Sequence, residues 1–306
     1  MYELWTQHDL QSVGSYSSYL QDSNGPFGLV KSTPSLSPEL VYTSTFNKAV
    51  KIVSGSDHIV ILTEQGDLFT FGCGEQGQLG RIPECFSTRG GRKGISVLLH
   101  PQVVRFRKSR GFPKPKFDDV FCGLYHTFAL TQDQAIYAWG LNNYGQLGTN
   151  DSNVRFQPER LPSDWITKST APNSSKNQCQ KLQIVGGQHH TLVCQNGSVF
   201  AIGRKEYGRL GLGENTEEPL LPKTIPDLQN IATIAAGTAC SFAVSESGEA
   251  FAWGMGTNLQ LGTGEEDDVW TPVKMTGKKI ENRRVLSASA GGQHTALLVS
   301  RADAVE

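Results

Sequence analysis

Residues 186–213 read GGQHHTLVCQNGSVFAIGRKEYGRLGLG, and this stretch decides the fold. An apolar run follows the histidines, the pair Asn196-Gly197 interrupts it, and a second apolar run leads into the glycine-rich end. Asn-Gly between two such runs is typical of a tight β-hairpin, because both residues tolerate the positive φ that the turn requires. The stretch therefore predicts two antiparallel strands and no helix.

The same pattern occurs four times, in residues Gly55–Gly80, Gly123–Gly148, Gly186–Gly211 and Gly237–Gly262. Turns of the same kind, at Gln65-Gly66 and Ser247-Gly248, separate the two apolar runs in other copies. Each copy ends on a Gly-x-Leu-Gly-like tail whose Leu is expected to fill the core between neighbouring repeats. A tandem array of hairpin units is typical of β-propellers, in which each unit buries its apolar face against the next.

The spacing of the repeats narrows the class of propeller. We take His58, His126, His189, Cys240 and His294 as equivalent positions, which gives repeats of about 50 to 70 residues, longer than the about 40 to 45 of WD-type repeats. Two insertions, Arg81–Asp119 and Thr149–Cys179, account for the longest intervals and are predicted to be surface loops.

The two ends of the chain carry only parts of a repeat. Gly14–Leu29 contains only the tail of a unit, and Gly291–Val299 contains only its beginning. We expect residues 1–29 to be the end of a truncated blade, residues 30–300 to hold four complete repeats plus the start of a closing blade, and residues 301–306 to be a tail.

Composition excludes several classes of protein. Of 306 residues 33 are Gly, which fits many tight turns, and the formal net charge of −1 gives no overall attraction to nucleic acid. No apolar run approaches the roughly 18 residues of a membrane span, and the amino-terminal residues do not resemble a secretory signal. The six cysteines form no CxxC pair, so we expect no structural zinc site.

Four segments resemble the regulator-of-chromosome-condensation family, the guanine-nucleotide exchange factors of the small GTPase Ran. They are GGQHHT at 186–191, YGRLGLG at 207–213, FAWGMGTN at 251–258 and GCGEQGQLGR at 72–81. The resemblance covers residues 20–300 and implies an all-β, seven-bladed propeller of which this chain holds an incomplete set of blades. It also implies promotion of GDP release from Ran at chromatin, in the nucleus.

Asp57 is the principal candidate for exchange activity. In the alignment above, its counterparts are Tyr125, Gln188, Ala239 and Gln293, so the repeat itself requires no carboxylate there. The resemblance implies that Asp57 engages the GTPase and promotes nucleotide release. A turn-forming aspartate is the alternative.

The resemblance implies further contacts with Ran. The residues concerned are Arg81, His189, His294 and a wedge-like segment made of Leu20, Gln21, Asp22, Ser23, Asn24, Gly25, Pro26 and Phe27. Leu20, Gln21, Pro26 and Phe27 differ from the family's form, and from the residues alone the segment is an inert hairpin loop. The histidines also have a purely structural interpretation, which we adopt for His58 and His126.

Contacts with chromatin are expected from two basic segments. Arg89, Arg92 and Lys93 lie in the loop 85–93, which resembles a loop that meets the acidic patch of nucleosome histones; a solvated loop is the alternative. A second run, which could contact DNA phosphates without sequence preference, contains Arg105, Arg107, Lys108, Arg110, Lys114 and Lys116.

Two other functions remain open. The chain could be a propeller scaffold for protein–protein interaction without exchange activity, or a hydrolase with converging carboxylates, although no acid and base pair is visible. An exchange factor works by binding energy alone, so the preferred interpretation requires no covalent chemistry, cofactor, metal or small-molecule substrate.

Overall fold

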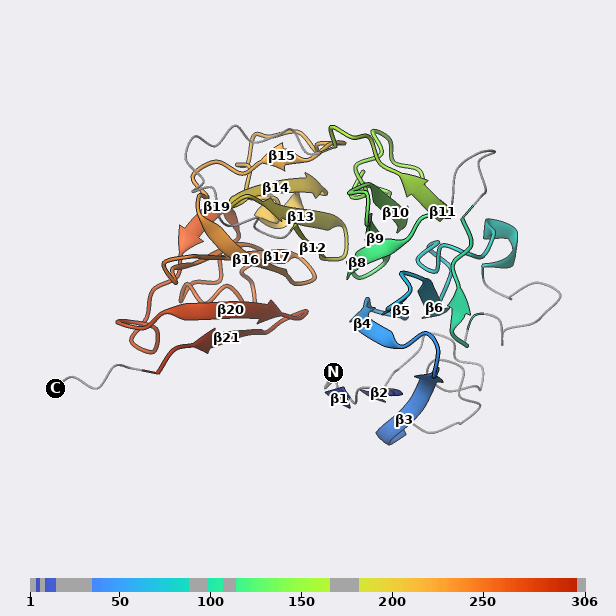
Figure 1. Cartoon of the computed structure of the whole chain (residues 1–306). Coiled ribbons are helices and arrows are strands. Elements are labelled where there is room, and N and C mark those ends of the chain that lie inside the picture. The colour runs from blue at the N-terminus through green and yellow to red at the C-terminus, as the bar shows by residue number, and fades with distance from the viewer. Residues whose placement is uncertain are drawn as a thin grey trace. The chain divides into compact units, whose positions relative to one another are not determined.

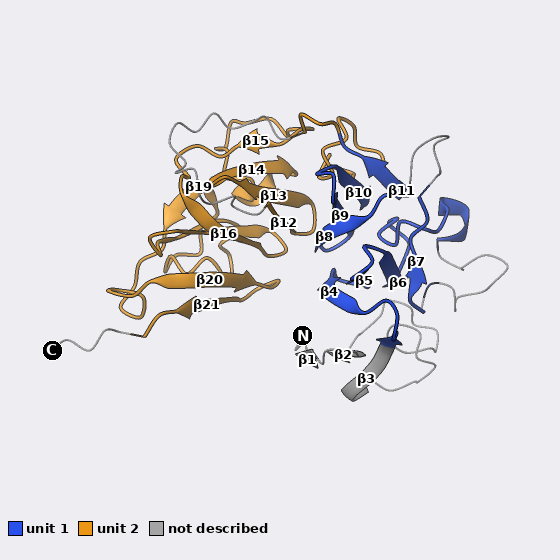
Figure 2. Ribbon diagram, in the orientation of Figure 1, with its two compact units in different colours: residues 1–141, 154–161 blue, residues 142–153, 162–306 orange. Residues whose placement is uncertain are grey.

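The computed structural model describes residues 4–5, 9–14, 35–87, 98, 100–106, 114–165 and 182–301, with side chains from residue 42 onward (Figure 1). Two compact units are present, coloured separately in Figure 2. Unit 1 comprises residues 1–141 and 154–161, and unit 2 comprises residues 142–153 and 162–306. None of the helices in the described residues has the length and apolarity to cross a membrane.

Unit 1 contains two four-stranded antiparallel sheets that follow each other in sequence. The first is ordered β4 (Ala49–Ser54), β5 (His58–Thr63), β6 (Leu68–Gly72) and β7 (Gln102–Val103), and the second β8 (Phe117–Cys122), β9 (His126–Thr131), β10 (Ile136–Gly140) and β11 (Arg155–Arg160). Before them, β1 (Leu4–Trp5), β2 (Asp9–Gly14) and β3 (Ser35–Thr43) form a three-stranded sheet, so the first partial repeat has a strand that reaches Thr43. A short 3-10 helix, η2 (Glu84–Phe86), follows β6.

Unit 2 repeats the same architecture. Its sheets are β12 (Gln183–Gly186), β13 (His190–Gln195), β14 (Ser198–Gly203) and β15 (Lys223–Thr224), then β16 (Ile231–Ala236), β17 (Cys240–Ser245), β18 (Ala250–Gly254) and β19 (Val269–Lys274), and finally the pair β20 (Val285–Ala290) and β21 (Thr295–Val299). The 3-10 helix η4 (Glu206–Gly208) lies in the loop after β14.

The predicted hairpins are present, and their turns have the expected backbone. Gly66, Asn196, Gly197 and Gly248 all have positive φ, between 52° and 88°. Strand pairing is the same in every complete repeat, since the first residue of the second strand lies opposite the last glycine of the third, as in His58 with Gly72. The hairpin prediction is confirmed.

The outermost strands were not predicted. β7 and β11 lie within the segments that we expected to be surface loops, and each pairs with the third strand of its sheet. β7 has only two residues, and β11 has intermediate and exposed positions in no regular order and no buried residue. A strand that is very short or that has no buried face shows no apolar alternation in its sequence, so periodicity cannot identify it.

The tails join successive repeats as predicted. Leu79, Leu147, Leu210 and Leu261 are all at most 2% exposed. In unit 1 the indole N–H of Trp139, from the following sheet, donates to the Gln78 carbonyl at 2.9 Å. In unit 2 Trp253 donates likewise to Arg209 at 3.1 Å. Each tail is therefore part of the core of the next repeat.

Candidate functional site

A hydrogen-bonded link connects two of the buried histidines, His58 and His190, to the next repeat. The ring Nε2 of His58 lies 3.0 Å from the hydroxyl of Thr127, which in turn lies 3.4 Å from the Gln78 carbonyl. His190 lies 2.9 Å from the Ser241 hydroxyl, which donates to the carbonyl of Arg209 at 2.8 Å. These imidazoles are fully buried, and desolvation lowers the pKa of His58 to about 3. His58, like the fully buried His126, is placed as a structural residue would be.

The link corrects the alignment of the third repeat by one residue. His190, not His189, lies opposite Gly203, and the amide of Gly187 bonds the carbonyl of His190 just as Gly55 bonds His58. A Cβ at Gly187 would lie 2.3 Å from the His190 ring, so glycine is required three residues before the buried imidazole. His189 therefore takes the position that we had assigned to Gln188.

Asp57 and His189 consequently occupy equivalent positions in their repeats. Each precedes the second strand, and its carbonyl accepts the amide that follows the last glycine of the third strand: Cys73 to Asp57 at 2.7 Å, and Arg204 to His189 at 2.9 Å. Tyr125 and Ala239 stand at the same place in the other two complete repeats. The backbone is thus fixed while the side chain is free to vary, which makes the position suitable for recognition.

Asp57 is partly buried. Burial raises the pKa of its carboxyl group, and a hydrogen bond from Ser56 opposes that shift. The neighbouring Cys73 thiol has a raised pKa, mainly through burial and in smaller part through the negative charges of Glu75 and Asp57. A partly desolvated carboxylate attracts a cationic partner more strongly than one in bulk water.

Arg81 does not pair with Asp57 in the described part of unit 1. Its guanidinium donates to the hydroxyl and carbonyl oxygens of Thr70 and to the carbonyl of Leu98. Burial lowers its pKa to about 10. These bonds attach the segment that follows β6 to the sheet, which gives Arg81 a structural role beside any contact with a partner.

His189 lies in a cluster of aromatic and charged side chains in unit 2. Its ring meets that of Tyr144 edge-on, with centroids 5.0 Å apart, and the Arg204 guanidinium lies 4.8 Å from the Tyr144 centroid. Arg204 also pairs with Glu206. Burial, followed by the charges of Arg209 and Arg204, lowers the pKa of His189 to about 4. The imidazole is therefore uncharged at neutral pH. Tyr144 was missed from the sequence because it comes from the preceding repeat.

His294 differs in place from His189. The amide of Gly291 bonds its carbonyl, which puts it in the phase of His58 and His190, yet its side chain is exposed. It lines a cavity of about 470 Å³ together with Gln260 and Lys278.

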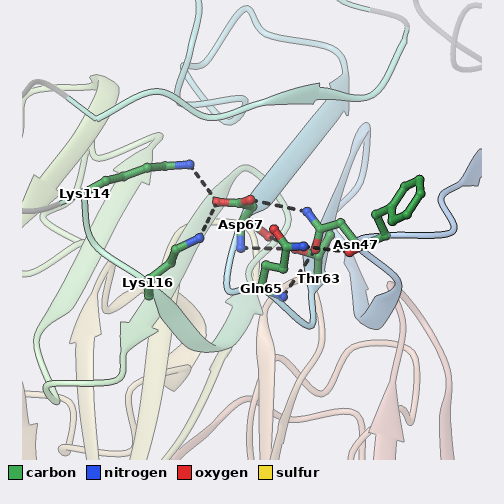
Figure 3. A network of polar contacts seen from close by, with 7 residues as sticks. Asn47, Thr63, Gln65, Asp67, Lys114 and Lys116 are labelled. Atoms are coloured by element: carbon green, nitrogen blue, oxygen red, sulfur yellow. Dashed lines mark hydrogen bonds and ion pairs between the residues drawn. The ribbon is translucent and has the colours of Figure 1, made fainter.

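The basic run is partly engaged within the protein. Lys114 and Lys116 both contact one carboxylate oxygen of Asp67, at 2.7 and 3.2 Å, and Asn47 donates to the other at 3.3 Å (Figure 3). These two lysines are therefore less available to phosphates than expected, whereas Arg105 is exposed. Arg107, Lys108 and Arg110 lie outside the described residues, as do the wedge-like segment 20–27 and Arg89, Arg92 and Lys93.

No group of three or more His, Cys, Asp or Glu side chains that could hold an ion occurs in the described ranges. The described cysteines are free thiols, and of these only Cys85 is exposed.

Comparison with known proteins agrees with this geometry. The regulator of chromosome condensation of Xenopus laevis is 52% identical over 283 residues, which cover 92% of this chain and 64% of that protein. Prp20p of Saccharomyces cerevisiae, a protein studied for binding Gsp1p and histones, superposes with a TM-score of 0.74 at 26% identity, over 95% of this chain and 64% of that one. The chain thus spans about two-thirds of their length.

Another relative is the guanine nucleotide exchange factor SRM1 of Saccharomyces cerevisiae, 29% identical over 81% of this chain and 50% of that protein. The predicted fold is confirmed: the four-stranded sheets are blades of a β-propeller that is incomplete relative to these proteins. The family model of the RCC1-like domain matches residues 6–297, and the chain belongs to that family.

Proposed function

We propose that this chain is part of a guanine-nucleotide exchange factor that acts on the small GTPase Ran at chromatin, in the nucleus. One observation carries the proposal: Asp57 and His189, both expected to contact Ran, occupy the same structural position in their repeats. That position fixes the backbone and leaves the side chain variable, and the residues there differ from those of the other repeats. The likeness to a regulator of chromosome condensation, and to a protein named as a guanine nucleotide exchange factor, supports it.

The mechanism needs no covalent step. The chain binds the nucleotide-free form of the GTPase better than the nucleotide-bound form, and this difference in affinity shifts the equilibrium toward GDP release. Asp57 supplies a negative charge that competes with the nucleotide for cationic groups of the phosphate-binding region. His189, held uncharged, supplies contact area and a hydrogen bond.

The test is the change Asp57→Ala. Ala239 stands at the same position in its own repeat, so the backbone tolerates alanine and the unfolding free energy should change by at most about 0.5 kcal/mol. The rate of fluorescent GDP release from Ran is measured against the concentration of the chain. The maximal rate should fall by about tenfold, which corresponds to ~1.4 kcal/mol of lost transition-state stabilisation.

Asp133→Ala is the matched control. It also removes a carboxylate, from the hairpin turn that follows β9, and should leave GDP release unchanged. The proposal is wrong if the wild-type chain does not accelerate release, and the role of Asp57 is wrong if the folded Asp57→Ala protein matches the wild type.

Binding to chromatin belongs to the same proposal and rests on the sequence. Arg89, Arg92 and Lys93 would contact acidic histone side chains, and Prp20p, a relative in structure, was studied for binding histones. The double change Arg89→Ala and Arg92→Ala should weaken nucleosome binding and its dependence on salt, while GDP release stays constant. Nucleosome binding equal to that of the wild type at every salt concentration would contradict this contact.

A further inference from the structure

The third repeat departs from the others at Arg209. The other complete repeats have Gln78, Gln146 and Gln260 at this place, and all three are buried. The side-chain oxygen of each accepts the backbone amide two residues earlier, at 2.7 to 3.0 Å, and so closes the turn of the tail. Arginine has no acceptor atom, so Arg209 cannot make this bond, although it is as deeply buried, at 2% exposure.

The turn at Arg209 consequently has another conformation. Its Nε donates to the carbonyl of Glu206 at 2.8 Å, and its guanidinium lies 5.3 Å from the ring centroid of Tyr207. Tyr207 has φ of 61°, a left-handed conformation that is uncommon for a bulky residue, while its counterparts in the other repeats do not have positive φ. The Tyr207 residue is 41% exposed.

The altered turn adds to the cluster around His189. Arg204, which stacks on Tyr144, pairs with Glu206 beside Tyr207, and the side chain of Arg204 is 25% exposed. Arg204 and Arg209 together outnumber the single carboxylate of Glu206, so the cluster carries a net positive charge. The cluster presents the exposed phenol of Tyr207, the accessible guanidinium of Arg204 and the neutral imidazole of His189. All three groups can donate hydrogen bonds to a carboxylate.

We propose that Arg209 is a positioning residue whose buried guanidinium holds the turn that carries Tyr207 and Glu206, the partner of Arg204, and that this surface, together with His189, binds an acidic segment of the GTPase. The proposal rests on the proposed function, because His189 is a GTPase contact only within it. The Arg209 side chain is buried, so it acts through the turn and does not contact the GTPase itself. Its replacement of the glutamine common to the other repeats maintains an unfavourable backbone conformation, which is typical of a functional site.

The experiment is the change Arg209→Gln in the 306-residue chain. Glutamine is the residue that the other repeats use, so the variant can close its turn in their way and retain the fold. In GDP release from Ran, the half-saturating concentration of the chain should rise by about tenfold while the maximal rate stays unchanged, since a lost contact weakens association. Arg284→Gln, at an exposed arginine of the same unit, is the matched control and should behave as the wild type.

A second measurement does not depend on activity. In the wild type, burial, Arg209 and Arg204 lower the pKa of His189, and Glu206 opposes them. Removing the charge of Arg209 should raise the pKa of His189 from about 4 toward its ordinary 6.5, as followed by NMR of the ring protons. Arg209→Lys keeps the charge without the planar fork, so it should preserve the low pKa and still weaken Ran binding.

These outcomes separate the two proposals. A wild-type chain that does not accelerate GDP release refutes the proposed function and, with it, the acidic partner. If the wild type is active and Arg209→Gln has an unchanged half-saturating concentration, the positioning role is refuted while the exchange function stands. If Arg209→Gln does not fold, the Arg209→Lys variant decides, and wild-type binding by that variant refutes the role.

Discussion

The buried imidazole of His58 makes the stability of unit 1 sensitive to acid. In the folded chain its pKa is lowered to about 3, against 6.5 for an ordinary histidine. Between these two values the unfolded chain binds a proton that the folded chain does not, so stability is highest above pH 6.5 and falls as the pH decreases toward 3. Integrating this difference from pH 7 to pH 5 gives a loss of ~2 kcal/mol from His58 alone.

The change His58→Gln removes this titration and keeps a polar side chain near the Thr127 hydroxyl. We expect the variant to be less stable at pH 7, because its packing is altered, but to lose about 2 kcal/mol less than the wild type between pH 7 and pH 5. The assay is urea unfolding at several pH values followed by tryptophan fluorescence, since Trp139 is buried in the same unit. The reasoning is refuted if both proteins show the same dependence on pH, or if NMR shows the His58 ring gaining its proton near pH 6.5.

Two further predictions concern the packing of each unit. Lys51→Met should lower the free energy of unfolding by about 2 kcal/mol, because the buried Asp119 carboxylate loses the ammonium group 2.6 Å away. The Lys51 side chain is 36% exposed, which moderates this cost. Lys51→Arg should retain most of the stability in the same urea assay. Gly208→Ala should destabilise by about 3 kcal/mol and Gly213→Ala by about 1 kcal/mol. Both glycines have positive φ, but only at Gly208 would the new Cβ meet a backbone atom, the Val269 oxygen at 2.4 Å; equal thermal unfolding midpoints for the two variants would contradict this.

The inner part of the fold was predictable because its signals are local. A hairpin such as β13–β14 carries its own turn residues at Asn196 and Gly197 and its own apolar runs. The outer strands were not predictable, since β7 and β15 have only two residues each and β7 has none that is buried. Each of them is placed by pairing with the third strand of its sheet, and the residues of the outer strand themselves contain no pattern that predicts this pairing.

The alignment of the third repeat could not be decided from the sequence. Gly186-Gly187 and His189-His190 allow two registers that differ by one residue, and the structure selects one, through the bond between Gly187 and the His190 carbonyl and the pairing of His190 with Gly203. The cluster around His189 was missed for a related reason, since Tyr144 and Arg204 are 60 positions apart. One signal was present in the sequence: Arg209 interrupts a column that otherwise contains glutamine.

The link from imidazole to hydroxyl to tail carbonyl has a consequence for anyone who would engineer arrays of these repeats. The tail of a sheet contains Gln78 or Arg209, but the hydroxyl and the indole that bind the carbonyl of that residue belong to the sheet that follows. A segment that is to be transplanted should therefore contain a tail together with the sheet that follows it, and not a sheet together with its own tail. A recombination junction placed between a tail and the next sheet would separate partners, whereas one placed at Asn196-Gly197 keeps Arg209 on the same side of the junction as Ser241 and Trp253, which bind its carbonyl.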